Sequence, residues 1–89
     1  MRRAEILQTA LQCITVDRAA THGEAEDSFG LIAAYWSAHL DHPVTAHDVA
    51  AMMVLFKLAR MRGNPAHIDN AIDAAGYAAL AGEIATGAA

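Results

Sequence analysis

Hydrophobic positions along the chain recur at helical spacing between three breaks in the pattern. The breaks lie at His22-Gly23, Asp41-His42-Pro43 and Gly63-Asn64-Pro65, where glycine or proline interrupts a regular element. Between the breaks, apolar residues return every three or four positions, as they do on one face of an α-helix, and no segment alternates as a strand does. The pattern therefore predicts an all-α protein, a compact bundle of about four helices over residues 3–21, 26–40, 45–63 and 66–85.

Thr45 predicts the start of the third segment, because a threonine hydroxyl can accept a hydrogen bond from the amide three residues on, and Asp48 is favourable at the positive end of the helix dipole.

This third segment is apolar on two opposite faces. A short chain cannot cover both apolar faces by itself. We therefore expect one face to contact another subunit, so that the protein is a homo-oligomer. The faces carry Val49, Met52, Met53 and Phe56, and Val54, Leu55, Leu58 and Met61.

Composition agrees with a single helical domain over residues 1–89. Hydrophobic residues make up 55% of the chain, and 22 of the 89 residues are alanine, which favours helix intrinsically. The second helix places its aromatic side chains on one face, which predicts that Trp36 lies in the main core with Phe29 and Leu40.

Hydropathy, charge and cysteine content indicate where in the cell the protein is located and which kinds of partner it binds. No apolar run is long enough to span a membrane, polar residues interrupt the N-terminal segment where a signal peptide needs an apolar core, and Cys13 has no second cysteine with which to pair. We therefore expect a cytoplasmic protein. A net charge of −4 gives no general attraction to a phosphate backbone, so nucleic acid is not expected as the main partner.

Two carboxylates on the fourth helix are the first candidates for chemistry. Asp69 and Asp73 are four residues apart, so they lie one turn apart on one face, and Asn70 is close by. Oxygens in such an arrangement suit a hard cation such as Mg²⁺. The alternative is structural: Asp69 stabilises the helix dipole and Asp73 pairs with a cation such as Arg18. Spacing alone leaves both open.

Basic residues give candidates for phosphate binding. Lys57 and Arg60 lie three residues apart beside an apolar stripe of the third helix, and Arg18 continues an apolar face of the first. A buried guanidinium needs an anion, which is either a carboxylate of the protein or the phosphate of a ligand. For Lys57 the alternative is a side chain that extends from a helix end into solvent.

Further candidates lie near helix ends. Glu24 and Asp27 open the second helix, where acidic residues are ordinary, but they can also complete a metal site. His22 and His67 border helices and are possible additions to the same site. The spacing of serine, histidine, aspartate and cysteine predicts no nucleophilic triad, so covalent catalysis is not expected.

Taken together, these residues resemble a family of small, functionally uncharacterised proteins found mainly in phages and prophages. The resemblance runs from about Arg18 to Glu83. It is carried by Arg18 with His22-Gly23 and by the segments 28–33 (Ser-Phe-Gly-Leu-Ile-Ala), 36–38, 45–50 (Thr-Ala-His-Asp-Val-Ala), 57–60, 64–70 and 73–78.

That family in turn looks like a distant relative of the MazG-like all-α nucleotide pyrophosphohydrolases, which bind Mg²⁺ with acidic residues from two helices. Those enzymes have Glu-x-x-Asp on the later helix, where this chain has Asn70-x-x-Asp73. The resemblance implies a metal-dependent, nucleotide-handling protein. Asp27, Asp69 and Asp73 would hold the metal, and Lys57, Arg60 and Arg18 would neutralise phosphate.

A second hypothesis belongs to a different class. The chain is then a non-catalytic helical homo-oligomer that binds a host or phage protein, and its inward-facing charges form a structural network. A DNA-binding regulator is disfavoured, because the third helix is too apolar to serve as a basic recognition helix.

Overall fold

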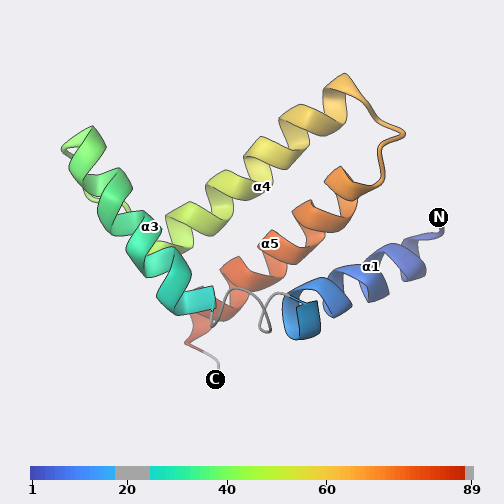
Figure 1. Ribbon diagram of the computed structural model, residues 1–89, viewed down its shortest axis with the longest axis horizontal. Coiled ribbons are helices and arrows are strands. Elements are labelled where there is room, and N and C mark those ends of the chain that lie inside the picture. The colour runs from blue at the N-terminus through green and yellow to red at the C-terminus, as the bar shows by residue number, and fades with distance from the viewer. Residues whose placement is uncertain (18–24, 88–89) are drawn as a thin grey trace.

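The computed structural model describes residues 1–17 and 25–87, and within them the chain is helical and contains no strand (Figure 1). This part of the chain forms four α-helices, which confirms the predicted all-α class. A short π-helix, η1, follows the first of them. The elements are α1 (Arg3–Gln12), η1 (Cys13–Asp17), α3 (Ala25–Leu40), α4 (Ala46–Gly63) and α5 (Asp69–Thr86).

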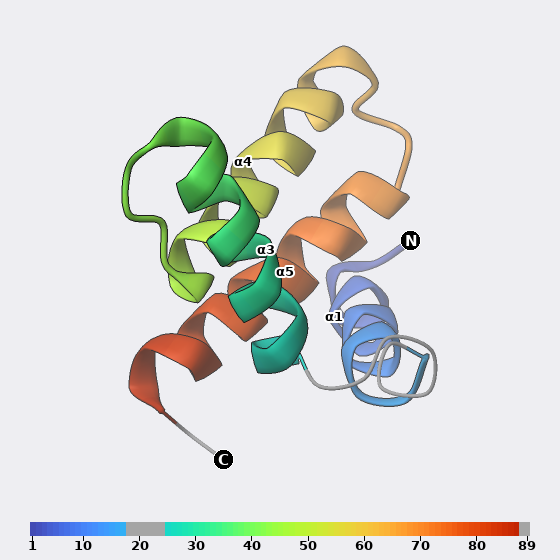
Figure 2. The same ribbon diagram turned by 60° about the vertical axis from the view of Figure 1, so that its left-hand side comes forward.

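The arrangement is built on an antiparallel pair. Helices α4 and α5 run side by side over most of their length. Helix α3 crosses α4 near the N-terminal end of α4 and then diverges from it, whereas α1 lies against the opposite side of α5 (Figures 1 and 2). Helix α5 is therefore the central helix, since it lies between α1 and α4.

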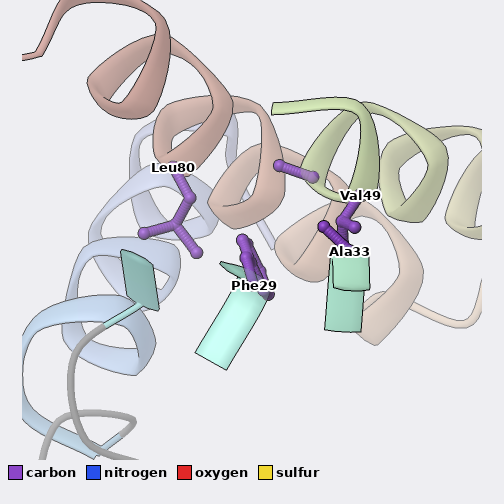
Figure 3. Close-up of a cluster of buried hydrophobic side chains, with 5 residues drawn as sticks. Phe29, Ala33, Val49 and Leu80 are labelled. Carbon is purple, nitrogen blue, oxygen red and sulfur yellow. The ribbon is translucent and has the colours of Figure 1, made fainter. Parts of the chain in front are cut away.

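The main core lies where α3, α4 and α5 meet. Figure 3 shows Phe29 between Leu80 on one side and Ala33 and Val49 on the other. Phe29 and Val49 are fully buried, with 1% and 0% of their surface exposed. Ala50 completes this buried cluster.

The prediction for Trp36 and Leu40 is confirmed only in part. Trp36 is partly buried and packs against the core cluster, as expected. Leu40 is 55% exposed, so its place in the core was wrongly predicted. The reason is geometric: the C-terminal end of α3 extends away from α4 and α5 (Figure 1).

The start of α4 is the boundary that the sequence predicted best. The Thr45 hydroxyl accepts a hydrogen bond from the Asp48 amide at 3.0 Å, and Oδ2 of Asp48 accepts one from the Thr45 amide at 2.9 Å. These two bonds form a capping box. The hydrogen bond from the Thr45 amide, with that from the Thr45 hydroxyl, lowers the pKa of the Asp48 carboxyl below its ordinary 3.8.

Two other boundaries differ from prediction. The first helix was expected to continue to residue 21, but α1 ends at Gln12 and passes into η1, and residues 18–24 lie outside the described part. Helix α5 starts at Asp69, three residues after the predicted start. Amides of this segment bond within a turn instead, since the His67 amide donates to the Asn64 carbonyl and the Asn70 amide donates to the His67 carbonyl.

A small residue allows η1 to approach α5 closely. Gly76 is buried in the middle of α5, and a Cβ atom placed there would lie 3.0 Å from Cγ2 of Ile14. That distance is shorter than an ordinary van der Waals contact, so the position favours glycine although glycine weakens a helix interior. No helix in the described ranges is both long and apolar enough to cross a membrane.

Candidate functional site

The candidate site is centred on an ion pair between α4 and α5. The Nζ of Lys57 lies 2.8 Å from Oδ2 of Asp73, and the two side chains are 18% and 39% exposed. An ammonium and a carboxylate at this distance share a charge-assisted hydrogen bond. Asp73 therefore has a cationic partner within the chain, Lys57, as the structural alternative predicted; Arg18 lies outside the described residues.

Asp73 also borders a small cavity between η1 and α5. The cavity has a volume of about 100 Å³, which is enough for a few water molecules but below the roughly 300 Å³ at which small-molecule sites begin. Gly76 and Leu80 lie on the same face of α5 as Asp73, as helical spacing requires. The contribution of η1 could not be foreseen, because it depends on how α1 packs. The other lining residues are Cys13, Ile14, Ile72 and Tyr77.

Two residues that were predicted to bind phosphate place their positive groups near the same aromatic ring. The Lys57 ammonium is 5.6 Å from the centroid of the Phe56 ring, and the Arg60 guanidinium carbon is 5.5 Å from it. Cations at this distance from a ring are attracted by its electron-rich face. Arg60 is exposed, so, contrary to expectation, it does not need a buried anion.

Asp69 occupies a different environment from Asp73. Its side chain is 70% exposed, and Oδ2 lies 3.8 Å from Nε2 of His67, a distance at which any attraction is weak in water. Asn70, one residue on, is 3% exposed and is the buried polar residue of the described chain. The first turn of α5 therefore presents Asp69 to solvent and turns Asn70 inward.

Several predicted site residues cannot be placed. Arg18, His22 and Glu24 lie outside the described residues, and so does the side chain of Asp27. The predicted metal set of Asp27, Asp69 and Asp73, and a phosphate role for Arg18, stay predictions.

The fit of Mg²⁺ can be judged from the donors that are described. Within residues 1–17 and 25–87, no three histidine, cysteine, aspartate or glutamate side chains come together as metal ligands. The Lys57 ammonium also holds the Asp73 oxygen that a cation would need. The described donors do not by themselves fit a magnesium ion.

A second feature of the surface is apolar. Helix α4 buries only Val49 and Ala50 completely, although apolar residues surround it. Met52, Leu55 and Leu58 are 42%, 63% and 47% exposed. The exposed side chains come from both apolar faces predicted for this helix, since Met52 was placed on one of them and Leu55 and Leu58 on the other.

Near one end of this surface, α3 and α4 enclose a shallow apolar hollow. It has a volume of about 220 Å³ and is lined by Trp36, His39, Leu40 and Met52. The hollow exists because α3 diverges from α4 beyond their crossing point (Figure 1).

Within the described residues, the fold and surface define a small helical protein with an exposed apolar helix face and an interhelical ion pair. The chain belongs to the family described as a domain of unknown function, DUF6378, which matches residues 5–85.

Among its relatives are two phage proteins. The chain is 41% identical over 76 residues to the Gene 55 protein of Mycobacterium phage L5, and 37% identical over 73 residues to the Gene 55 protein of Mycobacterium phage D29. The matches cover 84% and 82% of this chain but 49% and 48% of those proteins, so the chain spans about half the length of the curated relatives it matches. No solved structure matches it. The predicted resemblance to a small phage-borne family is confirmed, and the MazG-like link stays a prediction.

Proposed function

We propose that this chain is a homo-oligomeric interaction module. The observation that carries the proposal is the outer face of α4, where Met52, Leu55 and Leu58 are all more than 40% exposed. Burial of a leucine or methionine side chain contributes about 1.5 to 3 kcal/mol when complete, so three half-exposed side chains on one helix retain a substantial driving force for association. Contiguous apolar patches on soluble proteins commonly mark contact sites.

The relatives support the idea of a module. In both phage proteins the matching region accounts for about half of the chain, so a comparable length of polypeptide accompanies it. A helical unit that associates with copies of itself would bring such accompanying parts, or a bound host or phage protein, into one assembly.

Sedimentation velocity between about 1 and 100 μM tests this proposal directly. We expect the protein to sediment as a dimer or larger species at the upper end of this range and to shift toward monomer on dilution. A stable monomer at about 100 μM would contradict the proposal, because an interface formed by several leucine and methionine side chains should associate at such concentrations.

A second candidate function is binding of a phosphate-bearing ligand, and one observation favours it. Lys57 and Arg60 direct two positive groups to the same Phe56 ring, and Arg60 is accessible. Two neighbouring cations can hold phosphate oxygens. This candidate is the coarse form of the nucleotide-handling role that the MazG-like resemblance predicts. In its finer form, the protein is a Mg²⁺-dependent nucleoside triphosphate pyrophosphohydrolase.

Thermal unfolding with ATP, in the presence and absence of MgCl₂, tests the second candidate. A ligand at a hundred times its dissociation constant should stabilise the folded chain by about 2.7 kcal/mol. We expect Arg60→Met to abolish the stabilisation and Arg2→Met, at an exposed arginine that precedes α1, to leave it intact. No shift with millimolar ATP would rule out this candidate, and release of pyrophosphate would extend it to catalysis.

A further inference from the structure

The outer face of α4 has a symmetric sequence. Asp48, Leu55 and Arg62 are spaced by seven residues, which is close to two helical turns, so they lie along one line of the helix. All three are exposed. An acidic residue therefore stands at one end of the line, a basic residue at the other, and a leucine at the centre.

The flanking positions repeat this symmetry about Leu55. Met52 and Leu58 stand three residues before and after it, and both are large, apolar and partly exposed. Alanines stand four residues before and after it, at 51 and 59. The face thus has matching residues in both directions and opposite charges at its two ends. We call Asp48, Met52, Leu55, Leu58 and Arg62 the outer stripe.

We propose that the outer stripe binds the outer stripe of a second copy of this chain, with the two α4 helices antiparallel and related by a twofold axis at Leu55. This inference rests on the proposed function and specifies its interface. In such a pair each Leu55 meets the partner's Leu55, and each Met52 lies near the partner's Leu58. The alanines at 51 and 59 oppose one another, so the helix backbones can approach closely.

Charge selects the antiparallel orientation. A twofold pair places Asp48 beside the partner's Arg62 at both ends of the contact, which gives two opposite-charge pairs. A parallel pair in register would place Asp48 beside the partner's Asp48, which is repulsive. The cap at the start of α4 uses Oδ2 of Asp48, so Oδ1 can accept from a guanidinium.

Two complementary charge variants test the orientation and the register together. Asp48→Lys alone gives two like-charged pairs in the proposed dimer, and so does Arg62→Glu alone. We expect each variant to raise the dimer dissociation constant about tenfold or more, because it replaces two opposite-charge pairs with two like-charged pairs. A one-to-one mixture restores both opposite-charge pairs in a heterodimer, so its dissociation constant should return to within about threefold of wild type.

The mixture also controls for the helix cap. Asp48→Lys removes half of the capping box, but a change in folding alone cannot be repaired by adding a second chain that carries Arg62→Glu. Glu83→Lys, on an exposed position of α5, is the matched charge control and should dissociate like wild type.

Sedimentation equilibrium of the full chain distinguishes the possible results. Recovery in the mixture supports the antiparallel stripe. A wild-type dimer whose affinity neither variant changes, or whose loss the mixture does not repair, overturns this interface while the proposed self-association stands. A wild type that stays monomeric at about 100 μM overturns both.

Discussion

Helices α4 and α5 have the same length of 18 residues and lie side by side, yet they differ in how many of their side chains are buried. Helix α5 buries five residues, among them Ala74 and Gly76, whereas α4 buries two and leaves large side chains such as Leu55 in solvent. The helix with small residues is central, and the helix with large ones is peripheral. Hydrophobicity alone therefore does not reveal which helix of this fold is most enclosed.

The difference follows from what each helix packs against. Helix α5 contacts α4 on one side and α1 with η1 on another, and its small residues allow these neighbours to come close. Helix α4 contacts α5 along its length, but α3 covers it only near its N-terminal end (Figures 1 and 2). Most of the outer face of α4 thus has no neighbour within the described chain.

The largest expected effect is the difference in stability lost when two leucines, Leu80 and Leu55, are each replaced by alanine. Leu80 on α5 is 4% exposed and Leu55 on α4 is 63% exposed. Leu80→Ala should lower the free energy of unfolding by about 2 to 5 kcal/mol, because it leaves a cavity in the core. Leu55→Ala should cost less than about 1 kcal/mol in dilute solution, where copies do not associate. Urea unfolding measures both, and equal losses would show that the chain itself covers the outer face of α4.

The next effect concerns the ion pair that joins the two helices. Asp73→Asn should lower the free energy of unfolding by about 1 to 2 kcal/mol, because it leaves the mostly buried Lys57 ammonium without a carboxylate. Asp69→Asn is the control and should change stability by less than about 0.5 kcal/mol, since Asp69 is exposed. A gain in stability from Asp73→Asn would instead indicate mutual repulsion of the two carboxylates, as expected of acids that await Mg²⁺.

A smaller effect is expected at two glycines of α5, where substitution by alanine should change the free energy of unfolding in opposite directions. Gly82→Ala should raise the free energy of unfolding by about 0.5 to 1 kcal/mol, because alanine favours helix and nothing lies within 4 Å of the added Cβ. Gly76→Ala should lower it by about 1 kcal/mol, since the new methyl group meets the stiff, β-branched Ile14. Thermal unfolding of both variants checks the signs, and stabilisation by both would mean that η1 is not held against α5.

The smallest expected effect is a pH dependence of stability that arises at the start of α4 and is absent at the start of α5. The pKa of Asp48 is lowered by its hydrogen bonds with Thr45, so its contribution to stability is present above pH 3.8 and is lost as pH falls through the lower pKa of the folded state. The stability difference between wild type and Asp48→Asn should therefore shrink between pH 5 and pH 2.5. Helix α5 begins after Ile68 without a side-chain cap, so Asp69→Asn serves as control. An unchanged difference across this range, measured by urea unfolding, would argue against the cap.

Local sequence signals predicted the helices well. Helix α3 begins within one residue of its predicted start, and the Thr45 cap of α4 was identified correctly. Both depend on short-range chemistry that the sequence displays directly. The end of α1 and the start of α5 were missed, because competing π-helical and turn hydrogen bonds differ little in energy from α-helical ones.

The candidate site was harder to predict, because it depends on how helices face one another. Asp73 was rightly expected to need a cation, but the pairing with Lys57 follows from the register of α4 against α5, which sequence spacing does not reveal. Arg60 was expected beside an apolar stripe, with a buried guanidinium, and is exposed, because α3 diverges before it reaches that part of α4. The oligomeric state and the metal ligands stay predictions.

The turn between α3 and α4 bears on the order in which the molecule folds. The Ser37 hydroxyl accepts from the Val44 amide at 2.8 Å and donates to the Val44 carbonyl at 3.2 Å, which closes a loop of only a few residues. Short loops lose little chain entropy on closure, so this corner can form early. The contact of Ile14 with Gly76 joins segments about sixty residues apart and should form late. Substitution of Ser37 should then slow refolding, whereas substitution of Ile14 should mainly accelerate unfolding.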